Sequence, residues 1–84
     1  MHIRNRLGMH ARAAARFVQA ANRFHSRILV TRDARTMDGK SILGILLLAA
    51  SHGTRLVLQA EGADEEAAIN TLARLVEGGF GESL

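Results

Sequence analysis

The sequence contains no cysteine, no proline, no tryptophan and no tyrosine, and phenylalanine is its only aromatic residue. Without cysteine, the chain forms no disulfide, no cysteine-ligated zinc site and no thiol nucleophile. Three phenylalanines offer little for a surface that stacks on single-stranded nucleic acid. The longest apolar run, residues 45–50, is far shorter than the roughly 18 residues of a membrane span. No signal peptide is recognisable, so we expect a cytoplasmic protein without membrane insertion.

The length of 84 residues indicates one domain, spanning residues 1–84. Such a chain buries only about 60 to 65% of the surface that its unfolded form exposes, which favours a surface site over a deep substrate cavity. The net charge is +3, with ten arginines and a single lysine. A basic nucleic-acid-binding module therefore stays an alternative, and it predicts salt-sensitive binding. The scarcity of aromatic residues argues against it, and we expect no nucleic-acid partner.

Hydrophobic periodicity predicts four strands and three helices. The strands are expected at 2–7, 26–32, 35–38 and 54–61, and the helices at 11–24, 41–51 and 64–77. The second and third strands are close enough in sequence to form a hairpin. This order predicts an α+β fold in which a small, mostly antiparallel sheet is covered by helices on one face.

The chemistry concentrates in Gly8-Met9-His10-Ala11-Arg12-Ala13-Ala14. His10 precedes a strongly predicted helix, whose first-turn backbone N–H groups form a ready anion site. Arg12 adds a charged fork that suits phosphate. A nucleophilic imidazole beside such donors is what reversible phosphoryl transfer through a phosphohistidine needs. The alternative is a protein-interaction module in which His10 is inert.

Two stretches carry a resemblance to a known family. The His10 segment resembles the motif Gly-Leu-His-Ala-Arg-Pro-Ala of the HPr family, the histidine-containing phosphocarriers of the bacterial phosphoenolpyruvate:sugar phosphotransferase system. The stretch Gly39-Lys40-Ser41-Ile42-Leu43-Gly44-Ile45 resembles that family's regulatory motif, Lys-Ser-Ile-Met-Gly-Val, and the spacing of the two motifs also matches. The resemblance covers nearly the whole chain and implies an HPr-like open-faced β-sandwich of four strands and three helices.

The resemblance implies a phosphoryl carrier rather than an enzyme, acting in sugar uptake without a cofactor. His10 corresponds to the histidine that Enzyme I phosphorylates on Nδ1 and that passes the group to a IIA-type acceptor. Arg12 corresponds to the arginine that neutralises the phosphate. Ser41 corresponds to the serine phosphorylated by HPr kinase/phosphorylase where that enzyme exists, although a helix-capping role alone would account for it. The alternative within the family is a regulatory or nitrogen-branch relay protein not coupled to sugar transport.

The helix expected at 41–51 is apolar on nearly every side, and a surface helix buries only one. We expect Ile45, Leu48 and Ala49 in the core. The resemblance makes the partly exposed residues a partner-docking surface, namely Ile42, Leu43 and Leu46 together with Arg16. The alternative is burial of this surface in a dimer, and we expect a monomer.

Two further expectations concern the charged and polar residues. The remaining histidines lack metal-ligand spacing, so no metal is assigned. Glu82 and the terminal carboxylate are candidates for an acidic partner of Arg12. Ala13 departs from the family motif, because it stands where the motif has proline and loses a fixed φ while keeping its backbone N–H.

Overall fold

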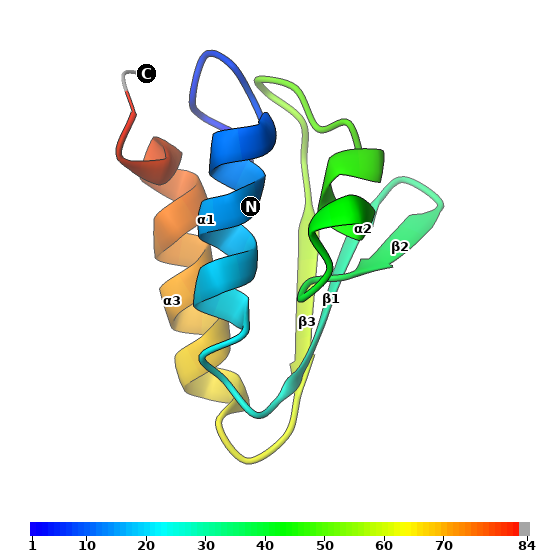
Figure 1. Cartoon of the computed structure of the whole chain (residues 1–84), viewed down its shortest axis with the longest axis vertical. Helices are drawn as coiled ribbons and strands as arrows, with labels where there is room; N and C mark the ends of the chain where they lie inside the picture. Colours follow the sequence, from blue (N-terminus) through cyan, green and yellow to red (C-terminus); the bar gives the residue numbers. More distant parts are fainter. Residues whose placement is uncertain (83–84) are drawn as a thin grey trace.

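The computed structural model describes residues 1–82 (Figure 1). Its elements, in chain order, are α1 (Ala11–Ala21), β1 (Arg27–Arg32), β2 (Arg35–Asp38), α2 (Ile42–Leu47), β3 (Val57–Glu61), α3 (Glu65–Glu77) and the 3₁₀ helix η1 (Gly79–Gly81). The strands form one antiparallel sheet in the order β2-β1-β3. Helices α1 and α3 lie side by side, and α2 contacts both α1 and β2 (Figure 1).

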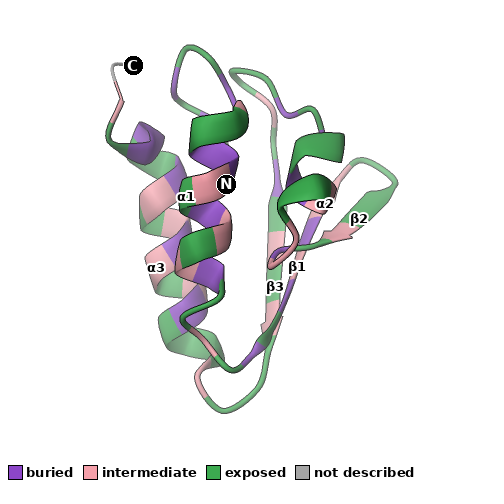
Figure 2. Ribbon diagram, in the orientation of Figure 1, coloured by how far each residue is buried: buried purple, intermediate pink, exposed green. Residues whose placement is uncertain are grey.

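The core lies between the sheet and the helices, as the buried stripes of α1 and α3 show (Figure 2). Ile28 and Val30 of β1 are buried, and their cross-strand partners in β3 are Ala60 and Leu58. This alternation follows from the two-residue period of a strand. The helices contribute residues at three- and four-residue spacing, namely Ala13, Ala14, Phe17 and Ala21 from α1 and Ala68, Leu72 and Val76 from α3.

The expected first strand is not confirmed as a fourth member of the sheet. Within residues 1–82, the N-terminal segment makes a single bridge, between His2 and Arg55, beside the three strands. The N–H of Ile3 donates to the carbonyl of Thr54 at 2.9 Å, but the chain then leaves the sheet in a turn. Gly8 ends this turn with φ +70°, and a Cβ there would lie 2.6 Å from the carbonyl oxygen of Ala50. The turn therefore requires glycine.

Helix α2 ends at Leu47, earlier than the predicted residue 51. Arg32 donates to the carbonyls of Leu48 and Ala49, both at 2.8 Å, and Arg35 donates to that of Leu47 at 3.1 Å. Ala49 takes a positive φ of 49°, which the α-helix does not allow. Ala49 is consequently exposed, so its predicted core position is wrong, whereas Ile45 and Leu48 are buried as expected.

Asp64, at the start of α3, ties this helix to the segment between α1 and β1. Its carboxylate accepts from the N–H groups of His25 and Ser26, both at 2.9 Å, and from the Ser26 hydroxyl. These bonds, the Ser26 hydroxyl first, lower the pKa of Asp64 to about 2. They compensate for the absence of a side-chain cap from Asp64 to its own helix.

The low pKa of Asp64 predicts an acid-dependent part of the stability. Because the folded-state pKa lies below the ordinary value of 3.8, this contribution is present above about pH 4 and is lost as the pH falls toward 2. Urea unfolding at a series of pH values should show that loss in the wild type and a weaker one in Asp64→Asn. Equal pH dependence in the two proteins would contradict this assignment.

Candidate phosphoryl-transfer site

His10 is the N-cap of α1, as the sequence predicts. Its backbone is extended, with φ −75° and ψ 178°, and its Nδ1 accepts a hydrogen bond of 3.2 Å from the N–H of Arg12. The ring therefore stands at the end of the helix where first-turn N–H groups have no partner within the helix. This end also carries the positive pole of the helix dipole.

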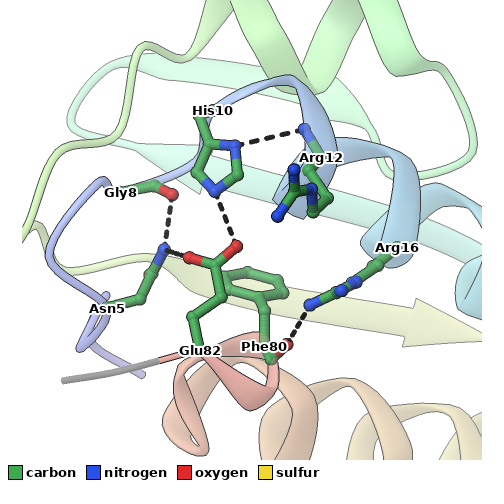
Figure 3. A network of polar contacts seen from close by, with 7 residues as sticks. All are labelled: Asn5, Gly8, His10, Arg12, Arg16, Phe80 and Glu82. Atoms are coloured by element: carbon green, nitrogen blue, oxygen red, sulfur yellow. Dashed lines mark hydrogen bonds and ion pairs between the residues drawn. The ribbon is translucent and has the colours of Figure 1, made fainter.

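The opposite nitrogen of the ring faces a carboxylate from the C-terminal segment (Figure 3). Nε2 of His10 lies 2.7 Å from Oε2 of Glu82. The other carboxylate oxygen, Oε1, accepts from Nδ2 of Asn5 at 2.9 Å, and the same amide nitrogen donates to the carbonyl of Gly8 at 2.7 Å. Asn5 is completely buried. The site thus joins the N-terminal turn, the start of α1 and the C-terminal segment.

These contacts assign the proton of the neutral ring. Nδ1 accepts from a backbone N–H, so it carries the lone pair, and Nε2 carries the proton that is donated to Glu82. The Asn5 amide, followed by His10 and Arg16, holds the pKa of the Glu82 carboxyl below its ordinary value, although desolvation acts in the opposite direction. Glu82 is therefore an ionised acceptor at neutral pH.

The segment Gly79–Gly81 brings Glu82 to the site. All three of its residues have positive φ, and the side chain of Phe80 is buried in the core. Arg16 of α1 donates from Nη1 to the carbonyl of Phe80. Core packing by Phe80 and this hydrogen bond together fix the direction from which the carboxylate approaches His10.

Arginine side chains line one side of the site formed by His10 and Glu82. Arg12 and Arg16 both extend from α1 beside the imidazole and the carboxylate (Figure 3). A shallow hollow here is lined by Arg6, Leu7, Arg12, Arg16, Gly81 and Glu82. Among residues 1–82, no ion pair joins Glu82 to Arg12, so the acidic partner expected for Arg12 contacts His10 instead. The terminal carboxylate, the other expected partner, lies outside the described residues.

Sequence reasoning did not identify Asn5 as a site residue, and it assigned Glu82 to a different partner. The two side chains are 77 positions apart and meet only in the folded chain. One signal was available, because an asparagine in the turn after a buried Ile3 has to be hydrogen-bonded if the turn is packed. That signal indicates burial and not a role at His10.

Ser41 and the exposed side of α2 form the second region that the sequence singled out. Oγ of Ser41 accepts from the N–H of Gly44 at 3.1 Å, so Ser41 is the N-cap of α2. Ile42, Leu43 and Leu46 are exposed as expected, and Leu47 of the same helix, which the sequence left unassigned, is exposed as well. We call these four residues of α2 the apolar patch, with exposed fractions of 46% for Ile42, 65% for Leu43, 38% for Leu46 and 51% for Leu47.

Two other features bear on the class of protein. Within residues 1–82, no three histidine, aspartate or glutamate side chains are grouped in a way that holds a metal ion. No helix in this part of the chain has the length and apolar character needed to cross a membrane.

Comparison with known proteins agrees with this geometry. Residues 1–78 match the family model described as the PTS HPr component phosphorylation site. The phosphocarrier protein HPr of Neisseria meningitidis serogroup A is 45% identical over 98% of this chain and 92% of its own. The HPr-like protein Crh of Bacillus subtilis is 43% identical over 92% of this chain and 91% of its own.

Solved structures match equally well. A crystal structure of HPr from Thermoanaerobacter tengcongensis has a TM-score of 0.96 and 49% identity, covering 100% of this chain and 94% of the other. A second structure of that protein, described as a dimer, has a TM-score of 0.83 over 98% of this chain and 94% of the other. Family match, sequence identity and fold lead to one assignment: the chain belongs to the HPr family of phosphocarrier proteins of the phosphotransferase system, whose members carry phosphoryl groups and are not enzymes.

Proposed function

We propose that this protein accepts a phosphoryl group on Nδ1 of His10 from Enzyme I and passes it to a IIA-type acceptor during sugar uptake. The supporting observation is the direction of Nδ1, which faces the N–H of Arg12 at the start of α1. A group attached to Nδ1 lies beside backbone donors and the positive end of an eleven-residue helix.

The surrounding residues supply what the transfer needs. The phosphoryl oxygens replace the ring nitrogen as acceptors for the free N–H groups of the first turn, and Ala13 keeps the N–H that a proline would lack. Arg12 is exposed and neutralises the incoming charge. Among residues 1–82 the His10 side chain stays 26% exposed, so the donor and acceptor proteins complete the site in turn.

The test is phosphoenolpyruvate-dependent labelling with Enzyme I, scored by intact mass and by acid lability. We expect one acid-labile phosphoryl group on the wild type and on Ser41→Ala. No label on a protein shown to be folded, with Enzyme I from its own source, would contradict the proposal. Onward transfer is then measured by adding a sugar-type IIA protein and following the loss of the label.

The apolar patch and Arg16 form the proposed docking surface for these partners. Exposed leucine and isoleucine side chains next to arginines are typical of a protein interface. Ser41 lies at the edge of this patch, at the N-cap of α2. Phosphorylation of Ser41 by HPr kinase/phosphorylase would place negative charge beside Ile42 and Leu43, where a partner made for apolar contact is repelled.

Ser41→Asp tests this regulation with a single change. Aspartate is as good an N-cap as serine, so α2 is expected to remain folded. The KM for phosphorylation by Enzyme I should rise about tenfold, which corresponds to about 1.4 kcal/mol. Asn70→Asp, on the exposed side of α3, adds the same charge away from the patch and should leave KM unchanged. Equal KM values for the two variants would contradict a regulatory role of Ser41.

A second candidate function is a regulatory or nitrogen-branch relay not coupled to sugar transport. The similarity to Crh, a protein named as HPr-like, is the observation that favours it. Rapid transfer to a nitrogen-type IIA protein, with none to sugar-type IIA proteins, would identify this branch. In either branch we propose a cytoplasmic monomer without a nucleic-acid partner, which sedimentation and a DNA-binding assay at low salt would check.

A further inference from the structure

The carboxylate of Glu82 stands behind the proposed nucleophile and is held there from two sides. Its Oε2 lies 2.7 Å from Nε2 of His10, and its Oε1 accepts from Asn5. Only 16% of the Glu82 side chain is exposed, against 26% for His10. A glutamate with both oxygens engaged and most of its surface covered is not a free surface charge.

The orientation of Asn5 strengthens this conclusion. Both N–H groups of its amide are used, one for the carbonyl of Gly8 and one for Glu82. Its Oδ1 is buried without a hydrogen-bond partner among the described residues. A flipped amide would set this oxygen against two acceptors, so the observed orientation is the only one that bonds. Asn5 therefore connects the Gly8 turn to Glu82 through its two N–H groups, while its own oxygen has no hydrogen-bond partner among the described residues.

We propose that Glu82, held by Asn5, is a positioning residue for phosphoryl transfer at His10. It keeps the ring proton on Nε2, which leaves the lone pair on Nδ1, and it stabilises the positive charge that the ring gains during transfer. This inference rests on the function proposed above, and no feature of the His10 motif itself predicts it.

Phosphoryl transfer to and from His10 moves one electron pair at Nδ1. The lone pair of Nδ1 forms a bond to phosphorus, while the bond from phosphorus to the donor protein's leaving atom breaks and its electron pair returns to that atom. The His10 ring then carries a positive charge and keeps its proton on Nε2, opposite the Glu82 carboxylate. When the group leaves for the acceptor, the pair returns to Nδ1 and the ring is neutral again. A carboxylate in this position plays the part of the aspartate behind the histidine in a catalytic triad.

The arginines around the site stabilise the negative charge of the phosphoryl group. Arg12 and Arg16 extend from α1, and Arg6 lines the same hollow from the N-terminal turn. Arg12 donates its backbone N–H to Nδ1, so it lies beside the nitrogen that would carry the phosphoryl group. Glu82 contacts the ring at the other nitrogen, Nε2. The two ring nitrogens thus have different partners: Nδ1 faces a backbone donor and Nε2 faces the carboxylate, while the arginines border the same hollow as Glu82.

Steady-state phosphorylation by phosphorylated Enzyme I tests the role of Glu82. Glu82→Gln keeps the length of the side chain and an oxygen that accepts from Nε2, but removes the charge and the second oxygen that accepts from Asn5. We expect kcat to fall about 10- to 100-fold, the scale known for the hydrogen-bond partners of metal-ligating histidines, with KM unchanged. Glu77→Gln removes the same charge from the exposed end of α3 and should behave as the wild type.

Nitrogen-15 NMR of the His10 ring measures its tautomer, which a general loss of stability would not change. For the neutral ring, the wild type should show a single tautomer with the proton on Nε2, and Glu82→Ala should admit the tautomer protonated on Nδ1. An unchanged kcat in Glu82→Gln, or a change in KM alone, would overturn the positioning role and leave the carrier function standing. Absence of labelling on wild-type His10 would overturn the carrier function and this role together.

Discussion

His10→Ala is expected to accept no phosphoryl group from phosphorylated Enzyme I while remaining folded. The substitution removes the nitrogen lone pair that faces the start of α1, which is the proposed nucleophile. Its structural cost is the loss of one N-cap, about 0.5–2 kcal/mol, together with the contact between His10 and Glu82. Intact-mass analysis after incubation with Enzyme I and phosphoenolpyruvate measures the outcome directly.

His10→Asn is the matched control for that result. Asparagine is among the best N-cap residues, so this variant restores the cap without restoring the nucleophile. Circular dichroism and urea unfolding should show α1 as stable as in the wild type, and the variant should still accept no phosphoryl group. Acid-labile label on either His10 variant would mean that a different residue carries the group.

Phe80→Ala is expected to give the largest loss of stability that bears on the site. The Phe80 side chain is 2% exposed, and removing a buried phenylalanine ring costs about 3–5 kcal/mol. In a domain of this size the melting temperature should fall by at least roughly 12 °C. Because Phe80 anchors the segment that carries Glu82, the rate of phosphorylation per folded molecule should fall as well. Urea unfolding and labelling at a temperature where the variant is folded separate the two effects.

Leu7→Ala is the control for Phe80→Ala. Leu7 is also a large apolar residue near the site, but it is 70% exposed and packs little. Its replacement should change the free energy of unfolding by less than about 0.5 kcal/mol. Similar losses in the two variants would contradict the anchoring role of Phe80.

The sequence alone predicted those parts of the fold that depend on local periodicity. β2 has the predicted bounds, and α3 begins one residue later than expected, because alternation and the apolar stripe of α3 are uninterrupted. The ends of α2 and the first strand differ from the prediction because distant groups decide them. The arginines of β1 and β2 end α2, and the turn after Ile3 takes the chain out of the sheet.

The candidate site also has a part that the sequence predicts and a part that only the fold brings together. His10 at the N-cap with Arg12 beside it was predictable, because both lie in one short segment at a glycine-to-helix junction. Glu82 lies 72 residues from His10, and its approach depends on positive φ at Gly79, Phe80 and Gly81 together with the burial of Phe80. No local pattern encodes that meeting, so a partner of His10 from the C-terminal segment required the structure.

The identity of the phosphorylated ring nitrogen tests the central claim most directly. Nitrogen-15 and phosphorus-31 NMR of the labelled protein distinguish a bond from phosphorus to Nδ1 from a bond to Nε2. The structure predicts Nδ1, because this nitrogen faces the start of α1 while Nε2 is held by Glu82. A phosphoryl group on Nε2, or on any residue other than His10, would contradict the account.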